Sequence, residues 1–98
     1  MIRQIFIAKL KAGVSESEVE ERMQAQRALK DKVEGVVDIA VGRSLNLYGV
    51  EDAVVMTIDL ADNRAWDNLM ASDYHTQLGN DAPKYYDVDS FVAAQVEI

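Results

Sequence analysis

The sequence predicts an α+β fold in which four strands form an antiparallel sheet and two helical regions cover one face of it. Three segments carry apolar side chains on both faces of a strand, which is typical of strands buried on two sides. They are residues 5–8, 36–41 and 53–58. Only two stretches have helical periodicity, and two helices cover one face of such a sheet. We therefore expect a second copy of the chain to cover the other face.

The first strand is predicted over residues 2–11, where side chains alternate between two faces. The helix that follows begins at a capping box, in which Ser15 and Glu18 satisfy each other's free backbone N–H groups. Its apolar positions recur at helical spacing as far as Val33. Gly35 is the expected end of this helix, because glycine accepts the backbone conformation found after many helices.

Two further strands are predicted at residues 36–44 and 52–60, joined by a loop. Asp62 is the expected N-cap of a second helix, since its carboxylate can accept from the first free N–H groups. Trp66 and Leu69 lie three residues apart on that helix. Two strands and a second helix are therefore expected after Gly35.

Ser72 predicts a new cap and a short turn of helix that contains His75. Residues 79–83 are expected to form a loop, and residues 85–97 the last strand. The resulting order, β-α-β-β-α-β, is that of the ferredoxin-like plait, with both helices on one side of the sheet.

The uncovered face is large enough to predict a dimer. Four strands about 4.8 Å apart and about 20 Å long cover roughly 400 Å² in projection. Monomers usually use an exposed apolar surface of this size for an interaction. We expect a homodimer that packs sheet on sheet into an α+β barrel.

Composition narrows the classes of function. The chain of 98 residues is expected to form one domain over residues 1–98. It has no cysteine, which excludes disulfides and thiolate chemistry. Its net charge of −7 argues against binding to nucleic acid. No segment approaches the apolar length of a membrane span or has the order of a signal peptide, so a cytoplasmic protein without a membrane partner is expected.

His75 is the single histidine and the first candidate for chemistry. At a helix start the positive end of the helix dipole disfavours the charged imidazolium, and a neutral imidazole beside a cavity can act as a general base. The alternative is a side chain that only packs or hydrogen-bonds at the helix start.

Two glutamines interrupt apolar faces. Gln4 shares a strand face with Phe6, and Gln26 lies in the apolar stripe of the first helix. Both amides are expected between helices and sheet, where they need partners. Three partners are open to each amide: the other glutamine, a water molecule or a ligand. We expect a structural hydrogen bond rather than a ligand contact.

Four aromatic residues gather around the second helix and the segment after it. Their polar tips suit a pocket for a planar ligand, and they equally suit the edge of a small core. They are Trp66, Tyr74, Tyr85 and Tyr86.

No spacing groups acidic residues with His75 in a metal-ligand pattern, so no metal site is expected. Glycines are too scattered for a phosphate loop, and no serine lies in a nucleophile elbow. We therefore expect no cofactor.

Several short segments together resemble the stress-responsive A/B barrel (Dabb) domain family, and the likeness runs over essentially the whole chain. They are residues 1–11 (MIRQIFIAKLK), 13–16 (GVSE), 28–31 (ALKD), 35–36 (GV), 41–43 (VGR) and 72–75 (SDYH). The resemblance implies the plait already inferred and a dimer formed through the sheets.

The resemblance also implies a possible chemistry. The family's plant polyketide cyclases close a linear polyketone by aldol condensation, and their working histidine matches His75. Their assisting tyrosine, six residues earlier, corresponds to Leu69. Two further histidines correspond to Gln4 and Val54.

The leading hypothesis is a dimeric domain that binds a small carbonyl-bearing or aromatic compound in an apolar pocket between helices and sheet. The alternatives are a cofactor-free cyclase-like enzyme with His75 as general base, and a non-enzymatic stress or assembly protein with a filled interior. A cofactor-free monooxygenase is disfavoured by the opening strand and the helix entry. The predicted lining residues are Gln4, Phe6, Gln26, Val54, Met56, Trp66, Leu69 and His75.

Overall fold

A four-stranded antiparallel sheet organises the computed structural model, which describes residues 1–98. Its strand order is β2-β3-β1-β4, so the two central strands are β1 and β3. This arrangement confirms the predicted ferredoxin-like α+β fold. The strands are β1 (Ile2–Lys9), β2 (Val36–Arg43), β3 (Ala53–Leu60) and β4 (Val92–Glu97).

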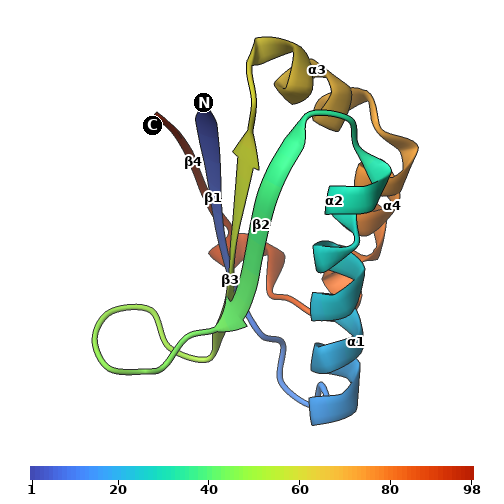
Figure 1. Ribbon diagram of the computed structural model, residues 1–98. Helices are drawn as coiled ribbons and strands as arrows, with labels where there is room; N and C mark the ends of the chain where they lie inside the picture. Colours follow the sequence, from blue (N-terminus) through green and yellow to red (C-terminus); the bar gives the residue numbers. More distant parts are fainter.

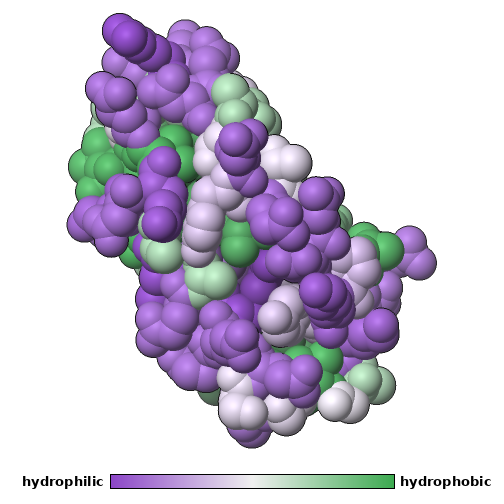
Figure 2. All heavy atoms as spheres, turned by 90° about the vertical axis from the view of Figure 1, so that its right-hand side faces the viewer, coloured by the Kyte–Doolittle hydropathy of each residue, from purple (hydrophilic) through white to green (hydrophobic).

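All the α-helices lie on one side of this sheet, and no helix covers the other side (Figure 1). The surface that the helix layer turns to solvent is largely hydrophilic (Figure 2). No helix combines the length and the apolar character that crossing a membrane requires. The helices are α1 (Glu16–Arg27), α2 (Leu29–Lys32), α3 (Asn63–Ala71) and α4 (Asp73–Asp81).

The core lies between the helices and the inner face of the sheet. Strand β3 shows this best, because Val54, Met56, Ile58 and Leu60 alternate inward and are all buried. Leu29 of α2 is fully buried in the same core. This layer of packed side chains fixes the walls of the candidate site.

The opposite, open face of the sheet is mainly apolar. Ile5 of β1 pairs with Thr57 of β3 on one side and with Ala94 of β4 on the other. One step further along, Ile7 pairs with Val55 on the same face. Figure 1 shows no α-helix on this side of the sheet.

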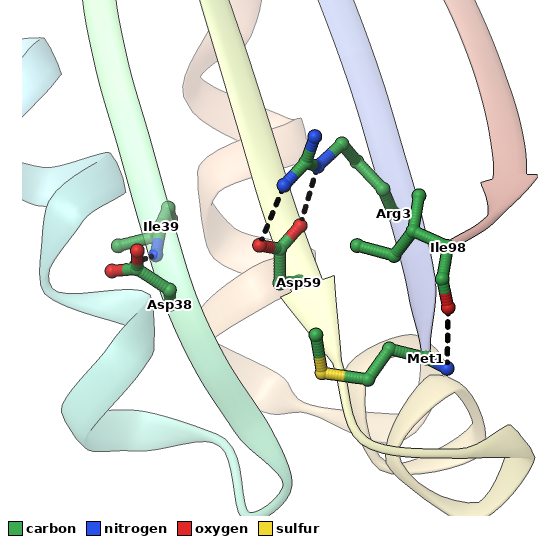
Figure 3. A network of polar contacts seen from close by, with 6 residues as sticks. All are labelled: Met1, Arg3, Asp38, Ile39, Asp59 and Ile98. Atoms are coloured by element: carbon green, nitrogen blue, oxygen red, sulfur yellow. Dashed lines mark hydrogen bonds and ion pairs between the residues drawn. The ribbon is translucent and has the colours of Figure 1, made fainter.

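One end of the open face carries an ion pair. Arg3 Nε lies 2.7 Å from Asp59 Oδ1 and Arg3 Nη2 lies 3.0 Å from Asp59 Oδ2, so the contact is bidentate. Figure 3 shows this pair between neighbouring strands, with Asp38 of β2 accepting nearby from the Ile39 N–H group. The Arg3 hydrogen bond lowers the pKa of Asp59 below its usual value.

The first helical region departs from the single helix predicted up to Val33. It breaks at Ala28, where the Asp31 N–H group bonds the Ala28 carbonyl three residues back in a tighter turn. Helix α2 then ends at Lys32, and Val33 already has extended backbone. The break turns Leu29 and Val33 toward the sheet, where both are buried.

The segment after Leu78 was predicted incorrectly. Helix α4 continues through Gly79 to Asp81, and a 3₁₀ turn (Ala82–Lys84) replaces the predicted loop at 79–83. The buried Leu78 holds α4 against the core. Pro83 fits the 3₁₀ turn because the first turn of a helix has no internal acceptor for its N–H groups.

Strands β1 and β4 are shorter than predicted. Strand β4 begins at Val92 rather than at residue 85, because a second 3₁₀ turn (Val88–Ser90) bends the chain after Asp87 caps it. Tyr86 forms only an isolated bridge with Leu10, so β1 ends at Lys9. These bends bring Tyr86 into the core, where it is 1% exposed.

Candidate functional site

A cavity of about 110 Å³ lies between the helices and the inner face of the sheet. The structure places five predicted lining residues around it: Gln4, Phe6, Gln26, Met56 and His75. The segments that supply them are distant in sequence, and the fold brings β1, α1, β3 and α4 together at this point.

The other three predicted residues lie outside the cavity lining. Val54 and Leu69 are fully buried in separate parts of the core. Trp66 is partly buried and packs against the part that contains Leu69. Their side chains support the walls of the core and do not border the empty space.

Seven lining residues were not predicted from the sequence. Most are ordinary apolar or small core residues that periodicity alone cannot assign to a cavity. They are Arg22, Leu29, Ile58, Leu78, Gly79, Ala82 and Phe91.

The N-terminus of α4 positions His75. Ser72 caps the helix, and its Oγ accepts a hydrogen bond from the His75 N–H group at 3.2 Å. The imidazole is partly buried, and burial lowers the pKa of His75 below its ordinary value of 6.5. The side chain is therefore neutral at pH 7 and has a nitrogen lone pair that can accept a proton.

Two glutamines border the cavity, and each uses its oxygen in a structural hydrogen bond. Gln26 Oε1 accepts from the Tyr86 hydroxyl at 3.2 Å, and Gln4 Oε1 accepts from Gln95 Nε2 at 2.7 Å. The two amides do not bond each other. Each keeps a side-chain nitrogen that donates to no protein group and is free to donate to a ligand.

Tyr86 remains a phenol in this environment. Burial raises its pKa above the ordinary value, and the adjacent Arg22 guanidinium, by polar contact and by charge, acts in the opposite direction. The protonated hydroxyl is the form that donates to Gln26. This hydrogen bond therefore points the amide oxygen of Gln26 toward Tyr86 and its nitrogen away from it.

Edge-to-face aromatic contacts build one wall beside the cavity. The ring of Phe6 lies 5.1 Å from that of Phe91 and 6.3 Å from that of Tyr86. Phe91 is 39% exposed and belongs to the accessible side of the lining. The predicted aromatic group is divided in the structure, because Tyr74 instead donates to the Ala25 carbonyl at 2.6 Å and joins α4 to α1.

Arg22 is the charged group that sequence reasoning missed. It lies on α1 and is only 6% exposed, and its Nη2 donates to the Leu78 carbonyl at 2.9 Å. Its guanidinium carbon is 5.3 Å from the ring centres of Tyr85 and Tyr86. Its spacing in the sequence could have indicated its burial. Arg22 lies three residues after Val19 and four before Gln26, on the buried stripe of the helix.

No three histidine or acidic side chains lie close enough together to form a metal site. The cavity lining instead combines an apolar wall with a neutral imidazole, two amides and one guanidinium. Such a set of groups can bind an organic molecule and can accept a proton from it.

Comparison with known proteins agrees with this architecture. The model of the family described as the stress responsive A/B barrel domain matches residues 2–95. No curated protein matches the sequence. Similar solved structures nevertheless cover almost all of the chain.

One similar structure, from Arabidopsis thaliana, is 14% identical with a TM-score of 0.86, and the match covers 100% of this chain and 95% of that one. A hydroxynitrile lyase from Passiflora edulis is 11% identical with a TM-score of 0.85, covering 99% and 92%. A dimeric ferredoxin-like protein of unknown function from Thermobifida fusca is 21% identical with a TM-score of 0.80, covering 99% and 90%. At these identities the likeness establishes the fold.

Proposed function

This chain belongs to the stress-responsive A/B barrel domain family, and we propose that it binds a small organic molecule in the cavity between its helices and its sheet. The observation that carries the proposal is an unfilled interior space bordered by free hydrogen-bond donors. Gln4 and Gln26 each present an unused amide nitrogen, and His75 adds a neutral imidazole. A space kept only for packing has no need of three such groups.

The size of the cavity limits the ligand. An apolar cavity of about 150 Å³ takes up benzene, whereas pockets for drug-sized molecules are several times larger. The 110 Å³ found here therefore suits a compound of about six non-hydrogen atoms, or the end of a larger one that leaves past Phe91. A non-enzymatic assembly protein with a filled interior is the less favoured alternative, because this interior is not filled.

We propose that the protein acts as a homodimer that buries the open face of the sheet. Ile5, Ile7 and Val55 on that face are only partly shielded within one subunit. The loop between β2 and β3 projects on the side away from the helices (Figure 1), and it exposes Leu47 and Tyr48 almost completely. Both features favour a second copy as partner, and the Thermobifida fusca protein is dimeric.

A second candidate function is cofactor-free proton transfer with His75 as general base. It is favoured by the neutral imidazole at the cavity and by the similarity to a hydroxynitrile lyase. A carbonyl compound bound there would lose a proton to the imidazole, and the amide donors would stabilise the resulting oxyanion. Cyclase chemistry in particular lacks its assisting tyrosine, because Leu69 occupies that position and lies outside the cavity lining.

A larger side chain that fills the cavity tests whether a ligand binds there. Gly79 lines the cavity, and a Cβ at this position meets no atom within 4 Å. Gly79→Leu places a flexible side chain at the lining, and Gly79→Ala is the matched control that adds only a methyl group. We expect small acids, ketones and aromatic compounds to shift backbone amide resonances of Gln26 and Leu78 in the control and much less in Gly79→Leu. The proposal is wrong if no compound moves these resonances in the unmodified protein.

A further inference from the structure

We infer that the ligand is an anion, a small organic carboxylate, and that Arg22 is the residue that recognises it. This inference rests on the proposed function, because it names the class of ligand that the same cavity takes. Arg22 is a buried cation that lacks a carboxylate partner.

The guanidinium of Arg22 is buried but not satisfied. Arg22 lines the cavity and is 6% exposed, and its Nε has no hydrogen-bond partner. A guanidinium has five N–H donors, and a buried donor without an acceptor costs about 1–3 kcal/mol. Proteins rarely keep a buried donor of this kind unless a ligand or a water molecule accepts its hydrogen bond.

A structural role explains only part of the environment of Arg22. Its Nη2 donates to the Leu78 carbonyl in the last turn of α4, where helix carbonyls commonly take side-chain donors. The guanidinium also makes cation–π contacts with the rings of Tyr85 and Tyr86. These contacts hold the group at the cavity, but the one hydrogen bond goes to a backbone carbonyl and none of them is an ion pair.

The cavity lining carries a positive charge although the protein as a whole is acidic. The whole chain carries a net charge of −7, yet the cavity lining contains Arg22 and no acidic side chain. The acidic group that acts on Arg22 from outside the lining is Asp81, which already accepts from Gln77 at 3.2 Å and pairs with Lys84 at 3.4 Å. A single positive charge in a mainly apolar space favours an anionic occupant.

The hydrogen-bonding groups match the same ligand. The amide nitrogens of Gln4 and Gln26 and the guanidinium of Arg22 are all donors, whereas a carboxylate offers only acceptors. His75 is neutral in the empty cavity, so no second cation competes with Arg22. An anion bound beside His75 would favour its protonated form and raise its pKa, which gives an independent readout.

Isobutyrate and isobutyramide form a suitable pair of probes, because they have the same shape and about six non-hydrogen atoms, within the limit set by the cavity. We expect the carboxylate to bind about tenfold more tightly than the amide, as a charge-assisted hydrogen bond is stronger than a neutral one. Affinities are measured from backbone amide shifts of the full chain at pH 7.5. We expect isobutyrate, and not isobutyramide, to raise the pKa of His75.

Two variants identify the cation responsible. Arg22→Gln should remove the preference for isobutyrate, and Arg22→Lys should keep part of it because the charge remains. Asp81→Asn is the opposite test: it removes the negative charge that acts on Arg22 from outside the cavity lining, so the preference for isobutyrate should stay or increase. If Arg22→Gln does not fold, the ratio of the two affinities in the unmodified protein still shows whether the ligand is an anion, and an unchanged preference in Arg22→Lys would overturn the role of the guanidinium.

The outcomes separate this inference from the proposed function. Equal binding of the two probes would overturn the anionic ligand and leave binding in the cavity intact. A preference for isobutyrate that survives in Arg22→Gln would overturn the role of Arg22. If neither probe binds and no other small compound does, the proposed function falls and the inference falls with it.

Discussion

The Tyr86 hydroxyl donates to Gln26 Oε1 across 60 positions of sequence, and the contact joins the segment before β4 to helix α1 at 3.2 Å. Both residues are 1% exposed, so bulk solvent has little access to this contact. The hydrogen bond turns the amide nitrogen of Gln26 away from Tyr86, where it remains free of protein acceptors. A structural contact thereby prepares a donor for the cavity.

Removing this hydroxyl should destabilise the fold. Tyr86→Phe leaves Gln26 Oε1 buried without its donor, which we expect to cost about 1–3 kcal/mol. Urea unfolding measures the loss. Tyr85→Phe is the control, because its ring is less buried and its hydroxyl makes no protein hydrogen bond, and we expect less than about 0.5 kcal/mol there. Equal losses in the two variants would contradict a specific role for the Tyr86 contact.

Gly35 should tolerate no side chain. Its φ is +94°, and an added Cβ would lie 2.4 Å from the Cβ of Ala65 on α3. Gly35→Ala combines backbone strain with a steric clash, so we expect a loss of about 2 kcal/mol or more in the free energy of unfolding. Gly13→Ala has φ +87° but nothing within 4 Å, and it isolates the strain alone. Thermal unfolding of both variants gives the contribution of the α3 contact by difference.

The pH dependence of stability should carry a contribution from His75. Burial lowers its pKa in the folded state below the ordinary 6.5, so between these two values the unfolded chain binds more protons. The free energy of unfolding should therefore fall as pH drops below about 6.5 and level off below the folded pKa. Comparison with His75→Gln in urea unfolding at pH 5 and pH 7.5 isolates this contribution. A difference between the proteins that is independent of pH would contradict it.

A charge on the open face of the sheet should prevent dimer formation. Val55 lies on that face beside Ile7, and Val55→Lys would place an unpaired ammonium group in the apolar interface. We expect the unmodified protein to sediment as a dimer and the variant as a monomer with unchanged circular dichroism. Asn80→Lys on the exposed side of α4 adds the same charge elsewhere and should remain dimeric. Identical sedimentation of the two variants would place the interface on another surface.

The periodic parts of the sequence predicted the fold well. The capping box of Ser15 and Glu18 and the Ser72 cap of α4 are present as expected, because local hydrogen bonds decide them. The end of α4 was predicted incorrectly because Gly79 has an ordinary helical environment there, and buried Leu78 outweighs the low helix propensity of glycine.

The candidate site was less accessible to sequence reasoning. Gln4, Gln26 and His75 were identified because polar groups on apolar faces stand out. Arg22 was missed because a long cation on a helix normally reaches solvent, and its burial depends on stacking with Tyr85 and Tyr86. That contact follows from the bends before β4, which no local pattern indicated.

The claim that the cavity binds a ligand is tested most directly by the NMR titration of the His75 imidazole. The chain contains one histidine, so the signal has a single assignment. We predict a pKa below 6.5 in the free protein and a different pKa when a small carboxylic acid is bound. A pKa of about 6.5 that small acids, ketones and aromatic compounds all leave unchanged would contradict the account, because it would describe a solvated side chain with no binding site beside it.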